Sequence, residues 1–166
     1  CMSGARPRSY GVDGQIALSE TVVREQEVAR VLAACDLPDF GAQREVVHAQ
    51  PVNFAIDHRT GLSDPRGQMG NVLAADMHVL TVESGPVQNV LHCINGVILN
   101  WRALRRQLMF GNIGAVEDEQ ELGAACIDLG GGTTGLSVFI KKHMIYADSV
   151  RLGGDHVSQD ISKGLQ

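Results

Sequence analysis

The sequence has few aromatic residues, no excess of positive charge and no long apolar run. Of its 166 residues, 4% are aromatic, and the formal net charge at pH 7 is −5. An acidic chain offers no charge surplus to nucleic acid or to an anionic membrane surface, so we expect no nucleic-acid partner. No stretch reaches the roughly 18 apolar residues of a membrane-spanning helix, and no signal-peptide pattern is present.

The cysteines and histidines lack the spacing of a metal site. No CxxC occurs among the four cysteines, and no two of the six histidines stand at i, i+4. We therefore expect reduced thiols in a cytosolic protein and no directly bound metal. The chain starts at Cys1 without an initiator Met and stops at Gln166 inside a helical pattern. We interpret it as an internal fragment.

What the sequence does contain is a succession of helix and strand patterns. Residues 9–19, with two glycines, are typical of a short hairpin or extended pair, and 58–71 of a long loop. Pro51 predicts an edge or a bulge in its strand. Strands joined by helices, then hairpin-linked strands, predict a mixed α/β protein. We predict helices over 19–35, 84–98 and 153–166, strands over 44–57, 72–82, 135–142 and 144–152, and a buried strand over 122–130.

The stretch DLGGGTT, residues 128–134, lies between two of these strands. A hairpin turn needs one or two glycines for positive φ, but here three are followed by two threonines. Backbone N–H groups of Gly130 to Gly132 could form an anion nest for a polyphosphate, and Asp128 could hold a divalent cation directly or through water. Hydrogen bonds to a charged acceptor contribute about 1.5–3 kcal/mol each. They would outweigh the glycine cost of about 0.5–1 kcal/mol per residue.

A second glycine pair follows the last strand. Gly153 and Gly154 precede a predicted helix whose N-terminus could face an anion, and we expect Asp155 to cap that helix. Alone, the pair is also explained by an ordinary loop and N-cap. Taken together, strand, DLGGGTT, strand, strand and GGD–helix follow the order of a nucleotide-binding actin-like domain.

Longer motifs narrow this to one family. The sequence resembles the FtsA family of actin-like bacterial cell-division proteins, its alphaproteobacterial members most of all. The resemblance covers nearly the whole chain, and PVNFAID (51–57) before a Gly/Pro loop is more discriminating than the glycine loop. The matching pieces are MSGARPRSYGVDGQIALSE, REVVHAQPVNFAIDHRTGLSDPRGQMGNVLAADMHVLTV and VEDEQELGAACIDLGGGTTGLSVFIKKHMIYADSVRLGGDHVSQDI.

The resemblance implies an α/β chain with three parts. Residues 1–83 would form the family's α+β inserted subdomain, and 84–119 the connection and the end of the first actin-like half. Residues 120–166 would begin the second half of the actin-like, ribonuclease-H-like nucleotide-binding domain. Asp128 would lie near Mg²⁺, through water, and Gly153 and Gly154 near the nucleotide. The phosphate-binding residues implied are Gly130, Gly131, Gly132, Thr133 and Thr134.

The resemblance also implies a function. The family binds ATP with Mg²⁺, self-associates into filaments and attaches to the inner face of the cell membrane through a C-terminal amphipathic helix. There it tethers the FtsZ ring at the division site and recruits later division proteins. Its hydrolysis is weak, so we expect a scaffold without catalytic residues rather than an enzyme. The first phosphate loop, the adenine-binding half and the membrane helix are missing from this chain, so we expect it to bind ATP poorly.

Alternatives remain at this point: a chaperone-type ATPase, a sugar kinase or a pilus-assembly relative of the family. A sugar kinase should show a catalytic Asp in a substrate loop, and none can be placed. A chaperone would leave residues 2–83 unexplained. In the loop GARPRSYG, Arg6 and Arg8 are explained equally by contact with a neighbouring subunit or late division protein and by solvated surface charge.

The segment 94–116 departs from the family pattern. At face value INGVILNWRALRRQLMFGNIGAV is a basic amphipathic helix suited to a membrane surface or a partner groove. The stretch GVILNWRALRRQLMF within it can be back-translated with permissible codons into a nucleotide sequence. When that nucleotide sequence is read one base earlier, it encodes a strand and helix pattern like the one that the family has at this place. We therefore hypothesise two compensating frame errors.

Overall fold

The structure of the chain is a computed structural model that describes residues 3–19, 22–94 and 117–165. It divides into two compact units. Unit 1 comprises Cys1–Ser9, Phe40–His48 and Leu80–Gln166, and unit 2 comprises Tyr10–Asp39 and Ala49–Val79. The anomalous segment lies outside the described residues from position 95 onward. The predicted domain boundaries at 83 and 119 remain predictions.

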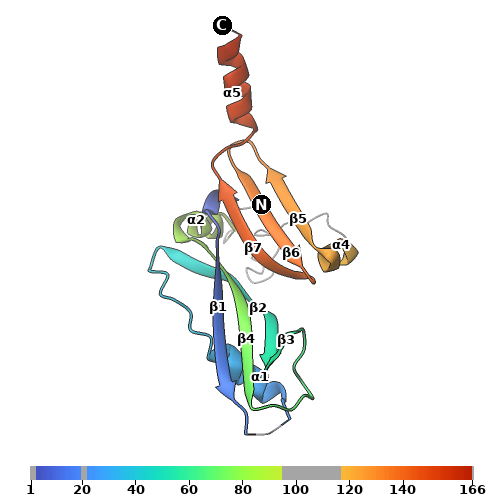
Figure 1. The fold of residues 1–166 in the computed structure, drawn as a ribbon. Coiled ribbons are helices and arrows are strands. Elements are labelled where there is room, and N and C mark those ends of the chain that lie inside the picture. Colours follow the sequence, from blue (N-terminus) through green and yellow to red (C-terminus); the bar gives the residue numbers. More distant parts are fainter. Residues whose placement is uncertain (1–2, 20–21, 95–116, 166) are drawn as a thin grey trace. The chain divides into compact units, whose positions relative to one another are not determined.

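The elements confirm a mixed α/β chain with two antiparallel sheets, drawn in Figure 1. The strand orders are β1-β4-β2-β3 and β5-β6-β7. No helix of the described ranges is long and apolar enough to cross a membrane. The elements are η1 (Ser3–Ala5), β1 (Arg8–Ala17), α1 (Glu25–Ala33), β2 (Arg44–Ile56), β3 (Arg59–Leu62), β4 (Val72–Glu83), α2 (Ser84–Ile94), α4 (Glu117–Leu122), β5 (Ala124–Leu129), β6 (Thr134–Ile140), β7 (His143–Val150) and α5 (Gly154–Gly164).

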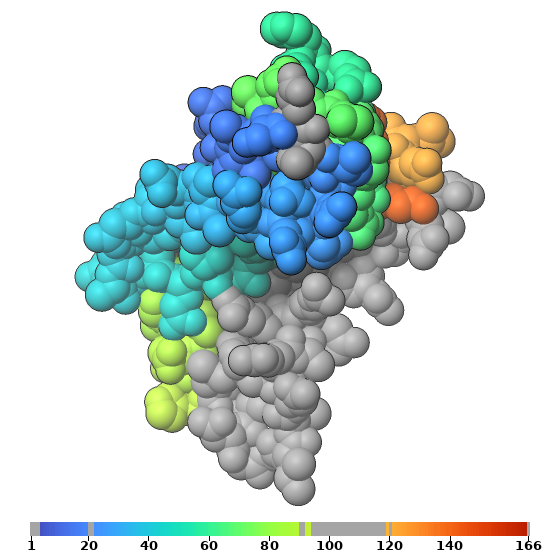
Figure 2. Space-filling model, turned by 90° about the horizontal axis from the view of Figure 1, so that it is seen from below, coloured from blue at the N-terminus to red at the C-terminus, as the bar shows by residue number. Residues whose placement is uncertain are grey.

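Unit 2 is built around helix α1, which begins six residues later than predicted. Val22 forms an isolated antiparallel bridge with Met69, and Val23 donates a backbone hydrogen bond to Gln68 (2.8 Å). These extended residues cannot belong to a helix, so the helix starts at Glu25. Val28, Val31 and Leu32 of the helix pack in the core, and residues of this part of the sequence form the blue surface in Figure 2. The core comprises Leu18, Val23, Val31, Cys35, Phe54, Ile56, Leu73 and Ala75.

The glycines of β1 do not make a turn, contrary to the predicted hairpin. The strand runs unbroken from Arg8 to Ala17. Gly14 is instead required by the end of α1, because a Cβ there would lie 2.7 Å from the backbone nitrogen of Cys35. No side chain fits that space, so this glycine permits close approach of two backbones.

The predicted long loop at 58–71 contains a short strand. β3 pairs antiparallel with the end of β2, Phe54 opposite Leu62 and Ile56 opposite Arg59, with an irregularity between them. β2 pairs with β3 only from Phe54 onward. Pro51 therefore lies opposite no residue of β3, and its missing N–H removes no hydrogen bond between these two strands.

Three charged side chains tie the rest of this loop to α1. Arg66 contacts Asp64 through two guanidinium nitrogens, the shorter contact being 2.7 Å, and Glu25 at 3.1 Å. Hydrogen bonds from the Arg66 side chain and backbone lower the pKa of Asp64 from 3.8 to about 2. The pair is exposed, so its role is to order the loop locally rather than to stabilise the unit.

In unit 1, β5, β6 and β7 form a meander of consecutive antiparallel pairs. Phe139, Met144 and Ala147 are buried together with Leu80 of β4. The apolar run of β5 predicted a buried strand, and this was wrong. Ile127 is 65% exposed and Leu129 79%, because no described element covers them.

Candidate phosphate-binding site

The DLGGGTT stretch forms the connection between β5 and β6. Leu129 stands opposite Thr134 in the antiparallel register, so four residues close the turn. The amide of Gly130 donates to the carbonyl of Thr133 (2.9 Å). In the described part of the chain, the amides of Gly131 and Gly132 donate to no acceptor. Two adjacent free N–H groups in a tight loop are the arrangement that binds anions.

Helix α5 begins directly against this loop. The amide of Gly154 donates to the carbonyl of Gly130 (3.0 Å), and that of Asp155 to the carbonyl of Gly131 (2.9 Å). Two orphan donors of the helix N-terminus are thereby satisfied by loop carbonyls. With their carbonyls held by α5, Gly130 and Gly131 are fixed in orientation. Figure 1 shows α5 beyond the end of the sheet formed by β5, β6 and β7.

Packing explains the glycine at position 153 but not the glycine at position 132. A Cβ at Gly153 would lie 2.3 Å from the carbonyl oxygen of Gly131 and 2.4 Å from that of Gly130. Its φ of −155° is open to any residue, so only the close approach demands glycine. A Cβ at Gly132 would meet nothing within 4 Å. Packing within the described chain therefore does not explain why residue 132 is a glycine. An approaching phosphate would explain it, because a side chain would occupy the space that the phosphate needs.

The other predicted residues are placed around this loop. Asp128 is exposed at the end of β5, opposite Gly135. Thr134 donates its hydroxyl hydrogen to the carbonyl of Leu152 (2.6 Å), so contact with a phosphate through that hydrogen would require this bond to be exchanged. The phosphate-binding roles of Thr133 and Thr134 remain predictions.

The prediction that Asp155 caps α5 was wrong. The N-cap is Gly153, whose amide donates to Nδ1 of His156 (3.2 Å), and Asp155 lies in the first turn. Its carboxylate turns toward the loop, since a Cβ on Gly131 would lie 3.1 Å from Oδ2 of Asp155. Within the described ranges no group of three or more metal-ligating side chains occurs. The role of Asp128 near Mg²⁺, through water, remains a prediction.

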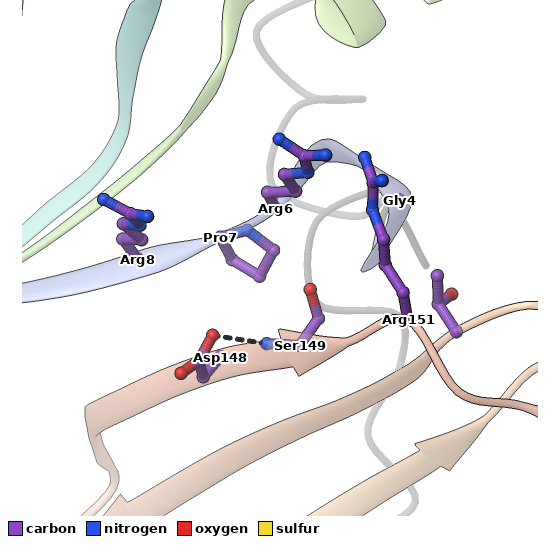
Figure 3. Close-up of a pocket in the computed structure, with 8 residues that line it drawn as sticks. Gly4, Arg6, Pro7, Arg8, Asp148, Ser149 and Arg151 are labelled. Atoms are coloured by element: carbon purple, nitrogen blue, oxygen red, sulfur yellow. Dashed lines mark hydrogen bonds between the residues drawn. The ribbon is translucent and has the colours of Figure 1, made fainter.

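Arg6 and Arg8, which the sequence explained equally by partner contact and by solvated surface charge, line a cavity of about 300 Å³ together with Thr133 of the glycine loop (Figure 3). Arg6 also pairs with Glu83 at 2.7 Å. Their contact with a partner remains a prediction. The cavity also contains Arg151, which sequence reasoning missed, although its place directly before the LGG of the second glycine pair could have indicated it.

Known proteins resemble this chain throughout. Residues 4–81 match the model described as "SHS2 domain inserted in FTSA", and residues 125–166 the model "Cell division protein FtsA". The chain is 37% identical to cell division protein FtsA of Rhizobium meliloti and 34% identical to that of Agrobacterium fabrum, covering 99% of this chain in each case. It spans 37% of the length of each of these relatives.

Among solved structures, a chain of the PilM–PilN type IV pilus biogenesis complex is similar with a TM-score of 0.45 at 16% identity. The match covers 95% of this chain and 44% of that one.

Proposed function

The chain belongs to the FtsA family, and we propose that it is part of a cell-division scaffold that binds ATP and Mg²⁺. The full protein would self-associate, tether the FtsZ ring to the inner face of the membrane and recruit later division proteins. Because the chain spans 37% of its relatives, these roles are proposed for the complete protein. The observation that supports ATP binding is the open glycine loop held by α5.

Each loop residue has a distinct task in this proposal. The amides of Gly131 and Gly132 donate hydrogen bonds to phosphate oxygens, and the missing Cβ of Gly132 leaves room for them. Bound Mg²⁺ would neutralise phosphate charge, and Asp128 would orient its water ligands. The first turn of α5, which points its amides at the loop carbonyls, keeps the two donors in place.

We propose a scaffold rather than an enzyme. A transferase of this superfamily would need a general base in a substrate loop, and the two carboxylates in and beside the loop at 58–71 have structural partners instead. Asp64 pairs with Arg66, and Asp57 accepts the amides of Asn71 and Val72 (2.9 Å each). These bonds lower the pKa of Asp57, which makes it a poor base.

The division role can be tested in cells. The complete gene, fused to a fluorescent protein, would be expressed in Rhizobium meliloti depleted of its own FtsA. We expect bands at mid-cell that coincide with the FtsZ ring, and restored division. Diffuse fluorescence in filamentous cells would contradict the proposal, provided that immunoblots show intact fusion protein.

The chain alone should bind ATP weakly. It presents one phosphate loop, and the cavity of about 300 Å³ beside that loop is lined by Arg6, Arg8 and Arg151 rather than by an apolar surface suited to adenine. Isothermal calorimetry of the 166-residue chain with Mg²⁺ and ATP should show no binding at micromolar concentrations, because most ligand contacts are missing. Micromolar affinity would show that the 166-residue chain forms a sufficient pocket by itself and would overturn this expectation.

A further inference from the structure

His156 stands in the first turn of α5 and exchanges two hydrogen bonds with Gly153. The amide of Gly153 donates to Nδ1 of His156 (3.2 Å), and the amide of His156 donates to the carbonyl of Gly153 (3.1 Å). One residue therefore holds both polar backbone groups of Gly153. The phosphate-binding roles proposed above do not involve this histidine.

The start of α5 depends on His156 because Gly153 has no side chain to contribute. In a capping box, the N-cap side chain and the side chain three residues later each accept one backbone amide. The close approach of Gly153 to the loop carbonyls excludes a side chain at the N-cap. Only the second acceptor is left, and His156 supplies it.

This hydrogen bond defines the state of the imidazole. A backbone N–H can only donate, so Nδ1 of His156 must carry a lone pair, and the ring is neutral with its hydrogen on Nε2. Protonation would place a second N–H against the amide of Gly153 and a positive charge at the positive end of the helix dipole. The bond therefore exists only with the neutral ring.

The start of α5 in turn orients the free amides of the loop. Directly after Gly153, two amides of the helix donate to the carbonyls of Gly130 and Gly131, at 3.0 and 2.9 Å. These carbonyls share their peptide units with the amides of Gly131 and Gly132. In a trans peptide unit the C=O and N–H bonds point in opposite directions, so holding the two carbonyls also fixes the two donors.

We propose that neutral His156 is a positioning residue, which holds Gly153 against the glycine loop and so orients the amides of Gly131 and Gly132 for phosphate. The effect passes from the imidazole to Gly153, then through the first turn of α5 to the loop carbonyls. His156 itself need not touch the phosphate. The inference rests on the proposed binding of phosphate by the glycine loop.

Hydrogen exchange of the 166-residue chain at pH 7.5 tests the contact. His156→Phe keeps a ring and a similar helix propensity but has no acceptor. His156→Asn keeps an acceptor, because its Oδ1 is bonded to Cγ as Nδ1 is. Protection of the Gly153 and Gly154 amides should fall about two- to tenfold in the Phe variant, since one hydrogen bond is lost, and stay near the original in the Asn variant.

The matched control is Gln159→Phe, which adds the same ring at another exposed position of α5 and should leave protection unchanged. If His156→Phe protects the Gly153 and Gly154 amides as well as the original chain does, or if His156→Asn loses as much protection as His156→Phe, the acceptor does not hold Gly153 and the inference is wrong.

The pH dependence separates an acceptor from a merely structural residue. Imidazole side chains change charge between about pH 5 and 8. Between pH 7.5 and pH 5, protection factors corrected for intrinsic exchange should fall about two- to tenfold in the original chain and stay constant in His156→Asn. The same response in both proteins would contradict the proposal. Both proteins keep the other charged groups of α5 and of the ends of β5 and β7: Asp128, Asp148, Arg151, Asp155, Asp160 and Lys163.

ATP binding tests the consequence for the loop. In the complete protein at pH 7.5, calorimetry should show Mg²⁺–ATP affinity about two- to tenfold lower in His156→Phe and restored in His156→Asn. If His156→Phe loses protection but binds ATP as tightly as the original, His156 caps the helix without positioning the loop, and the inference fails. If the complete protein binds no ATP, the proposed function fails and with it the phosphate role of His156, whereas hydrogen exchange still decides its contact with Gly153.

Discussion

Replacing Gly153 with alanine should release helix α5 from the glycine loop. The added Cβ would overlap two carbonyl oxygens at 2.3 and 2.4 Å, and both belong to backbone that cannot rotate away. No residue of α5 is buried, so its position depends largely on the bonds from Gly154 and Asp155 to the loop. Losing two hydrogen bonds of about 0.5–1.5 kcal/mol each should lower local stability by about 1–3 kcal/mol.

Hydrogen exchange measures this directly. Protection of the Gly154 and Asp155 amides should fall by about tenfold to a hundredfold in Gly153→Ala. Gly154→Ala is the matched control one residue away, since its Cβ would approach only the carbonyl oxygen of Gly130, at 4.0 Å. In the Gly154→Ala protein, the backbone amides of residues 154 and 155 should keep their protection against hydrogen exchange. Equal protection in both variants would mean that α5 is not held by the close approach at Gly153.

Replacing Gly14 with alanine should destabilise unit 2. The new Cβ would lie 2.7 Å from the nitrogen of Cys35 and 2.8 Å from the carbonyl carbon of Ala34, so the end of α1 must move. Cys35 is buried and donates its thiol hydrogen to the carbonyl of Val31 (3.4 Å), so that movement disturbs the core. Overpacking of this kind costs about 1–3 kcal/mol.

Urea unfolding and thiol labelling report on the Gly14 change together. The unfolding midpoint should fall, and the Cys35 thiol should react faster, while exposed Cys93 reacts at an unchanged rate. Gly11→Ala lies on the same strand, and its Cβ would meet nothing within 4 Å. It should be neutral or slightly stabilising. A Gly14→Ala protein as stable as the Gly11→Ala protein would refute the close-approach explanation.

The strands and the glycine loop could be predicted because their signals are local. β4, β6 and β7 lie close to their predicted ranges, since alternating and β-branched residues bounded by turn residues specify strands. The turn between β6 and β7 had no such signal. Lys141 and Lys142 take φ values of 50° and 63°, where glycine or asparagine is usual.

What failed depended on contacts distant in sequence. Gly14 was interpreted as a turn because nothing nearby indicates that the end of α1 passes over it. The burial of β5 was inferred from its apolar residues, but burial requires a covering element, and none is described. At the candidate site the loop was predicted, whereas Arg151 was missed because only the fold brings it beside Arg6 and Arg8.

The central claim, that the glycine loop binds phosphate, is tested most directly at Gly132. In the complete protein, Gly132→Ala should leave the unfolding midpoint unchanged, because its Cβ would meet nothing within 4 Å. Affinity for Mg²⁺–ATP should nevertheless fall about tenfold or more, since the methyl group blocks a charge-assisted hydrogen bond. Gly11→Ala should alter neither quantity. ATP affinity unchanged in Gly132→Ala, measured by calorimetry, would contradict the claim.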